Sequence, residues 1–134
     1  MAANDEAGAV AGTRYFLELY TYTRTSGDTA PWSALTHDQC GFCGAVAEMA
    51  AEATTSGRTV VGAEVTVHDA FATEVTPGQT YGVTANVTEA RSVESDASGT
   101  EVAANPASDN TLYVLMTWTD GWVVREVDVL PADS

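Results

Sequence analysis

The chain has 134 residues, 45% of them hydrophobic, which is enough to bury one core without a metal or several disulfides. Its charge is strongly negative: nineteen acids face five arginines, there is no lysine, and the formal net charge is −14. Nucleic acids and anionic membranes are recognised through Lys and Arg, so this composition disfavours both as partners.

The start of the chain has no recognisable signal. No run approaches the ~18 apolar residues that cross a bilayer. The opening Met1–Glu6 lacks the basic and apolar stretches of a secretory signal peptide. Residues 1–8 consist mostly of Ala, Gly and acids, which suits either a frayed helix start or, as we expect, a disordered or linker segment of the kind left after an export signal is trimmed.

Helical periodicity dominates the first part of the chain. A long amphipathic helix is predicted over residues 9–25, with Gly27 able to end it. Pro31 suits the first turn of a short helix over 32–35, and another full helix is predicted over 40–55.

After Gly57 the period changes to two, which is typical of strands with one buried face. The small, polar residues 92–110 predict an exposed and partly disordered hairpin excursion. Asp120-Gly121 is a strong hairpin signal, and we expect the two strands that it joins to form the centre of the sheet. The predicted strands cover residues 61–68, 81–88, 112–119 and 122–130.

Helices followed by strands predict an α+β domain in which the helices cover one face of an antiparallel sheet. The sequence indicates a single domain over residues 9–130, followed by a short tail at 131–134.

Several stretches occur together in one order: Tyr15–Tyr20, Thr25–Leu35, the Cys40-Gly41-Phe42-Cys43 motif and Thr117–Val124. In this order they resemble an uncharacterised family of exported lipoproteins from high-GC Gram-positive bacteria. The layout is similar to the nuclear-transport-factor-2-like superfamily, in which a curved sheet wraps around helices to form a cone with an open mouth. The resemblance implies this cystatin-like cone, an extracytoplasmic location and a membrane tether in the precursor, although this chain lacks the family's signal and lipid-attachment cysteine.

The two cysteines, Cys40 and Cys43, allow a structural disulfide, a redox couple or half a metal site. The redox interpretation is weakened because thioredoxin-type motifs follow a strand, whereas this one precedes all the strands. A zinc site would need His37 and His68 in place of the missing second ligand pair. We favour a structural disulfide that holds the start of the helix, and we expect no metal and no cofactor.

Two neighbouring residues, His68 and Asp69, are weak catalytic candidates. Adjacent strand residues point to opposite faces, so both can enter one pocket only if a bulge intervenes. Asp69 lies on the same face of the predicted strand as the apolar residues around it, which allows its carboxylate to point inward. Alternatively, Asp69 marks a bend or bulge in the strand. Further acids near predicted strand ends are Glu89, Glu126 and Asp128.

Aromatic residues are numerous for a chain of this size, and most are expected in the core. The candidates for lining a pocket are Trp32, Tyr81, Trp118 and Trp122.

Two functions follow as hypotheses. The first is a non-enzymatic extracytoplasmic domain that binds a small apolar ligand or a protein partner at the mouth of the cone, as a monomer or homodimer. The second is a small enzyme of the polyketide-cyclase or ketosteroid-isomerase kind with a carboxylate in its pocket, suggested by fold analogy. A lysine-free acidic surface is also typical of a cytoplasmic protein from a salt-adapted organism.

Overall fold

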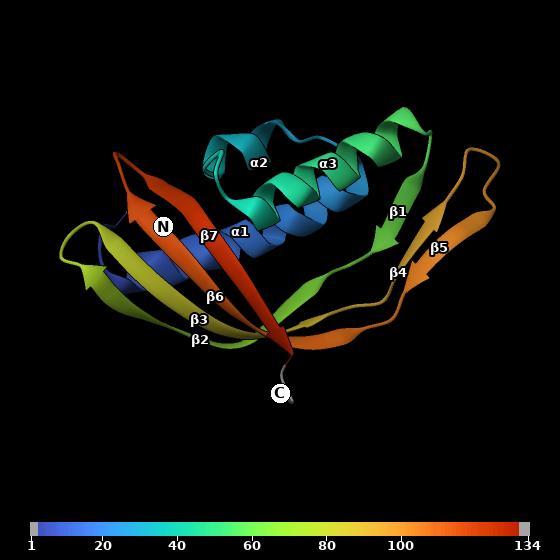
Figure 1. The fold of residues 1–134 in the computed structure, drawn as a ribbon. Coiled ribbons are helices and arrows are strands. Elements are labelled where there is room, and N and C mark those ends of the chain that lie inside the picture. Colours follow the sequence, from blue (N-terminus) through green and yellow to red (C-terminus); the bar gives the residue numbers. More distant parts are fainter. Residues whose placement is uncertain (1–2, 132–134) are drawn as a thin grey trace.

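The computed structural model describes residues 3–131, which form three helices and seven strands (Figure 1). The helices are α1 (Glu6–Ser26), α2 (Ala30–Leu35) and α3 (Gly41–Thr55). The strands are β1 (Thr59–Gly62), β2 (Val65–Thr76), β3 (Thr80–Glu89), β4 (Ser92–Ser95), β5 (Glu101–Asn105), β6 (Ser108–Trp118) and β7 (Trp122–Pro131). Within the described chain, no helix is both long and apolar enough to cross a membrane.

The strands form two antiparallel sheets that meet at a bend. One has the order β2-β3-β6-β7 and the other β1-β4-β5. Three chain segments run through both sheets, because β1 leads into β2, β3 into β4 and β5 into β6, and β7 belongs to the four-stranded sheet alone. The amide of Ala90 donates to the carbonyl of Glu64 at 2.8 Å where they meet. In Figure 1 the sheets form an open V with the helices inside it.

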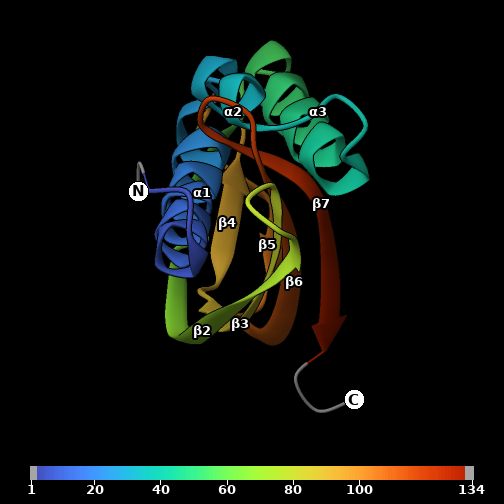
Figure 2. The ribbon, with the colours of Figure 1, turned by 90° about the vertical axis from the view of Figure 1, so that its left-hand side faces the viewer.

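The bend has a local cause in the backbone. Gly62 and Ala63 have φ values of 99° and 64°, so the chain leaves the extended conformation between β1 and β2. Pro106, between β5 and β6, lacks the N–H that would continue a ladder. The bend makes one side of the combined sheet concave, and α1 and α3 lie side by side over that side (Figure 2).

The core fills the space between the helices and the four-stranded sheet. The rings of Phe16 in α1 and Trp32 in α2 stack with centroids 4.7 Å apart, and both side chains are fully buried. The buried side chains of β3, β6 and β7 that face the helices are Tyr81, Val83, Ala85, Val87, Leu112, Val114, Met116, Trp122 and Val124. Alternation along the strands therefore selects one apolar face, as the sequence pattern predicts.

The first helix starts earlier than predicted. Asp5 accepts a hydrogen bond from the amide of Gly8 at 2.7 Å and caps a helix that begins at Glu6. Residues 6–8, expected in a linker, are therefore its first turn. The expected tail at 131–134 falls outside the described residues except for Pro131, which closes β7.

Three strand predictions need correction. Residues 61–68 are not one strand, and the break at Gly62 shifts the register so that Val60 is buried while Val61 is 70% exposed. The hairpin expected within residues 92–110 is present as β4 and β5, but the segment is more ordered than expected and β6 already begins at Ser108. Of the last two strands, β6 is central but β7 lies at the edge of its sheet.

Candidate functional site

The concave side of the bent sheet contains a trough between the helices and the strands. Leu17, Tyr20 and Arg24 lie along one face of α1, and Phe42 and Met49 lie along α3. These spacings of three, four and seven residues place the side chains of each helix on one stripe. Two cavities follow this stripe, one mainly apolar and one mainly polar.

The apolar cavity has a volume of about 70 Å³ and lies where α1 and the start of α3 approach the four-stranded sheet. Most of its wall is hydrocarbon, with one carboxylate, one amide and one phenol at its border. It is lined by Leu17, Tyr20, Phe42, Val65, Val87, Glu89, Asn110, Leu112 and Val129. A small apolar group placed here would lose contact with water on several sides.

A hydrogen-bonded cluster of Tyr20, Arg24 and Glu89 lies where the two cavities approach each other. Tyr20 Oη donates to Glu89 Oε2 at 2.9 Å, and Arg24 Nη1 donates to Tyr20 Oη at 2.9 Å. Arg24 Nη1 also lies 3.7 Å from Glu89 Oε2. Burial, reinforced by the Glu89 carboxylate, raises the pKa of Tyr20 to about 12. Tyr20 is therefore a neutral donor at physiological pH.

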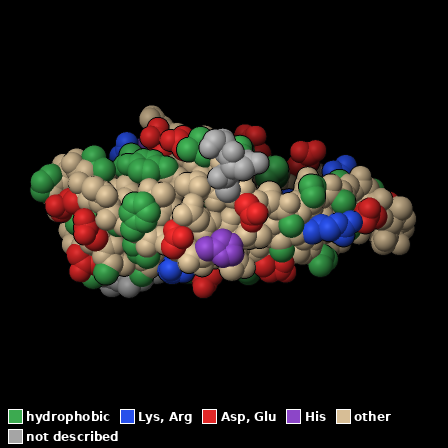
Figure 3. Space-filling view, turned by 90° about the horizontal axis from the view of Figure 1, so that it is seen from below, with side chains coloured by type: hydrophobic (Ala, Val, Ile, Leu, Met, Phe, Trp, Pro, Cys, Tyr) green, Lys and Arg blue, Asp and Glu red, His purple; other side chains and the backbone are tan. Residues whose placement is uncertain are grey.

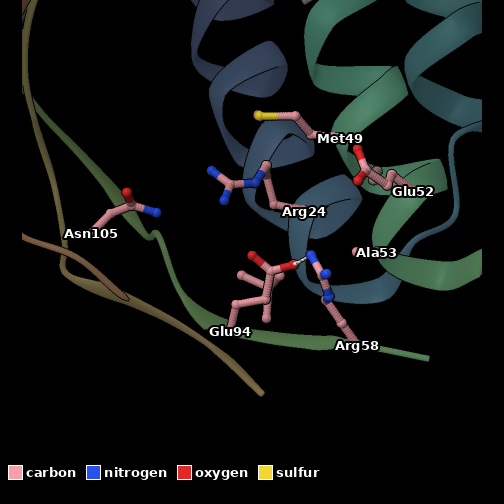
Figure 4. A pocket seen from close by; sticks show the side chains of 9 residues that line it. Arg24, Met49, Glu52, Ala53, Arg58, Glu94 and Asn105 are labelled. Carbon is pink, nitrogen blue, oxygen red and sulfur yellow. Dashed lines mark hydrogen bonds and ion pairs between the residues drawn. The ribbon is translucent and has the colours of Figure 1, made fainter. Parts of the chain in front are cut away.

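The polar cavity has a volume of about 160 Å³ and lies between the end of α1, the second half of α3 and the β1-β4-β5 sheet (Figure 4). Arg58 Nη1 and Glu94 Oε1 are 3.4 Å apart at its rim. Arg24 and Asn105 also line it, so two of the chain's five arginines reach this cavity. The trough therefore has an apolar end and an end with both hydrogen-bond donors and acceptors.

The structure places His68 and Asp69 away from the trough. A bulge between Val67 and Asp69 leaves His68 as the extra residue, so the predicted irregularity is present. Both side chains nevertheless face solvent on the outer side of the sheet. His68 Nε2 lies 2.6 Å from Thr88 Oγ1, and Asn86 donates to Asp69 at 2.7 Å. Of the two alternatives considered for Asp69, the structure therefore shows the bulge and not the inward carboxylate.

Of the three acids considered near strand ends, Glu89 lines the apolar cavity on the concave side, whereas Glu126 and Asp128 are exposed on β7. The outer face of the sheet, seen from below in Figure 3, mixes hydrophobic and acidic side chains. Phe71, Tyr113 and Leu130 are among the exposed apolar residues of these strands.

Of the four aromatic pocket candidates, three are buried in the core. Trp32 is fully buried, and the rings of Tyr81 and Trp122 meet edge to face with centroids 5.2 Å apart. Trp118 is half-buried and packs against Trp122 at 5.1 Å. These residues do not line the trough. Its aromatic side chains are Tyr20 and Phe42 instead.

Cys40 and Cys43 form a disulfide with an S–S distance of 2.07 Å, as favoured from the sequence. Cys40 caps α3, because its sulfur accepts from the amide of Cys43 at 3.2 Å. The indole of Trp32 donates to the carbonyl of Cys43 at 2.8 Å. His37 accepts a local hydrogen bond from the amide of Gln39. Among residues 3–131, no three His, Cys, Asp or Glu side chains are placed to hold a metal ion.

The residues of the trough were mostly missed by sequence reasoning. Tyr20 and Arg24 carry a usable signal, because an aromatic and a cation four residues apart on a helix face the same side. Glu89 was identified only as an acid near a strand end. The hydrogen bond between Glu89 and Tyr20 of α1 joins residues 69 positions apart in sequence. It depends on the bend between the sheets, which local sequence patterns do not encode.

A concave antiparallel sheet covered by helices on its inner side defines an α+β protein of the cystatin-like, nuclear-transport-factor-2-like cone type. The chain belongs to a family of unknown function, DUF6318, whose family model matches residues 1–128. No curated protein matches it.

The solved structures that are similar in fold include the following two. The intermembrane space region of the chloroplast protein ARC6 matches with a TM-score of 0.70 and 16% identity, over 96% of this chain and 98% of that one. An uncharacterised protein with a cystatin-like fold from Caulobacter vibrioides matches with a TM-score of 0.54 and 11% identity, over 92% and 91% of the two chains. At these identities the likeness establishes the fold alone.

Proposed function

We propose that this protein is a non-enzymatic binding domain whose trough takes a small apolar ligand or an apolar segment of a partner protein. The observation that carries the proposal is the apolar cavity, which continues the core of the cone to the surface between Phe42, Leu112 and Val129. Hydrocarbon left accessible in a concave site is the usual feature of a binding pocket. The polar cluster at its border would orient the occupant.

A titration with N-phenyl-1-naphthylamine tests this proposal, because the probe is neutral and fluoresces when it enters an apolar site. We expect saturable binding, weakened about tenfold by Phe42→Ala, since loss of one aromatic wall removes part of the buried area. Phe71→Ala is the matched control, because Phe71 is 58% exposed on the outer face. Equal binding by both variants, or no saturable binding at all, would contradict a ligand site in the trough.

The location proposed for this domain is outside the cytoplasm, in a precursor tethered to the membrane as a lipoprotein. The Cys40–Cys43 disulfide supports this location, because such bonds persist in oxidising compartments. The similar structure of the chloroplast protein ARC6 is that of its intermembrane space region. The intact mass of freshly purified protein under non-reducing conditions tests the location: a mass two hydrogens below that of the dithiol supports it, and free thiols support the salt-adapted cytoplasmic alternative.

A second candidate function rests on Glu89. Its carboxylate lies at the border of an apolar cavity, as a small isomerase or cyclase requires of a general base. Oε2 is engaged by Tyr20 and approached by Arg24, so Oε1 would have to take the proton. Deuterium incorporation from heavy water into an enolisable cyclic ketone, lost in Glu89→Gln, would support this enzyme. The same exchange rate in both proteins would exclude Glu89 as the base.

A further inference from the structure

The first turn of α3 has little intrinsic helical stability. Its sequence is Cys40-Gly41-Phe42-Cys43-Gly44, with glycine at two helical positions and no acidic residue in the first turn. Glycine is the least favourable ordinary residue in a helix after proline, and the cap here is a sulfur rather than an oxygen. The covalent bond from Cys40 to Cys43 spans this turn and holds its two ends together.

Phe42 lies inside this disulfide loop and is also part of the trough. Its ring stacks on Tyr20 with centroids 6.2 Å apart and meets Phe16 at 6.4 Å. It is half-buried and lines the apolar cavity. The side chain that forms the wall of the site is therefore held by the same four residues that the disulfide closes.

We infer that the Cys40–Cys43 disulfide is a redox switch for the trough: the oxidised bond keeps the first turn of α3 helical with Phe42 in the apolar wall, and reduction releases that turn and weakens binding. This inference rests on the proposed function, since it concerns regulation of the same site. Both cysteines are buried, with exposed fractions of 2% for Cys40 and 1% for Cys43, so a reductant has to approach the bond through a neighbouring opening. A third cavity, of about 190 Å³, is lined by Cys43 together with Trp32, Ser33, Thr36, His37, Asp38, Gly44 and Ala47.

The reductant is a dithiol. One of its thiolates attacks Cys43 Sγ, the S–S bond breaks, and its electron pair leaves on Cys40 Sγ. That thiolate lies at the N-cap of α3, where the amide of Cys43 and the helix dipole stabilise negative charge. The second thiol of the reductant then displaces Cys43 from the mixed disulfide. The reductant becomes a cyclic disulfide, losing two electrons and two protons, and the protein gains two thiols.

The test combines probe binding with hydrogen exchange on the intact chain. N-phenyl-1-naphthylamine is titrated into the oxidised protein, the protein reduced with dithiothreitol, and the Cys40→Ser/Cys43→Ser variant. We expect about fivefold weaker binding in the last two, which is about half the loss expected for oxidised Phe42→Ala, and faster amide exchange confined to residues 41–45.

A rescue variant separates positioning from general loosening of the fold. Gly41→Ala and Gly44→Ala are added to the cysteine-free protein, because a Cβ at either position meets no atom within 4 Å. The alanines raise the helix propensity of the turn without restoring the bond, and we expect them to recover most of the lost affinity and protection. Equal affinity of oxidised and reduced protein, with Phe42→Ala still weak, would overturn the switch and leave the binding site intact. No binding by the oxidised protein would overturn the proposed function and the switch with it.

Discussion

Tyr20 connects the two cavities through its hydroxyl, which accepts from Arg24 and donates to Glu89. The Arg24 side chain is only 11% exposed, so these two partners replace part of the water around its guanidinium. A phenol in this position holds a carboxylate and a guanidinium in fixed places without adding charge.

The raised pKa of Tyr20 predicts a loss of stability at high pH. Between about pH 10, where an unfolded tyrosine ionises, and about 12, the folded state keeps a proton that the unfolded state has released. The contribution of Tyr20 is therefore complete below pH 10 and decreases as pH rises to 12. Urea unfolding of wild type and Tyr20→Phe from pH 8 to 12 measures it, with an expected difference of about 2 kcal/mol that shrinks across this range.

Tyr15→Phe is the control for this experiment, because Tyr15 lies on the exposed side of the same helix. Its unfolding free energy should run parallel to that of wild type at every pH. A constant difference between wild type and Tyr20→Phe up to pH 12 would mean that the Tyr20 hydroxyl is not protected in the folded state.

At the scale of secondary structure, the bend between the two sheets determines where the trough lies. It begins at Gly62, whose φ of 99° is unfavourable for other residues and whose Cβ position would lie 2.1 Å from the carbonyl oxygen of Arg91. Backbone of the neighbouring segment therefore fills the space that a side chain would need.

Gly62→Ala should destabilise the protein by about 3 kcal/mol, because strain at positive φ adds to a contact with backbone that cannot rotate away. Gly78→Ala is the matched control: its φ is 68°, but nothing lies within 4 Å of its Cβ position. Gly78→Ala should lower the unfolding free energy only through backbone strain, by about 1 kcal/mol. Equal losses for the two variants in chemical denaturation would show that close packing at the bend contributes nothing.

The disulfide gives a second prediction at this scale. Closing a loop of four residues restricts little of the unfolded chain, and the entropy relation gives about 2 kcal/mol. Cys40→Ser/Cys43→Ser should therefore remain folded at room temperature and lose about that much unfolding free energy in urea. Wholesale unfolding would show that the bond supports the core rather than the start of α3.

The elements with strong local signals were predictable from the sequence. Two helix ends and one turn occur where the sequence predicts them, because each depends only on neighbouring residues. They are the helix ends at Gly27 and Gly57 and the turn at Asp120-Gly121. The break at Gly62 was missed because Val61 and Val65 continue the alternation across it. The residues that line the trough were not predicted for a related reason. Which side chains meet there depends on how far the sheet bends, and this bend results from packing over the whole fold.

At the scale of the whole molecule, the dominant feature is a charge of −14 on 134 residues. Two of the five arginines, Arg24 and Arg58, are engaged around the trough, so the remaining surface is still more acidic. Repulsion between these acids opposes the compact state and association with a second copy. At low ionic strength it acts over about 30 Å, which is comparable to the size of the domain.

Salt should therefore stabilise this protein. From about 10 mM to 0.5 M sodium chloride the screening length falls several-fold. We expect the melting temperature to rise by about 5 °C, corresponding to about 1 kcal/mol. The Glu18→Gln/Glu48→Gln/Glu101→Gln variant, which changes three exposed acids and takes the charge from −14 to −11, should melt higher at low salt and respond less. A melting temperature that falls with salt would mean that attractive pairs such as Arg58–Glu94 outweigh the repulsion.

Sedimentation at both salt concentrations tests self-association, since the same repulsion predicts that any homodimer forms only when the charges are screened.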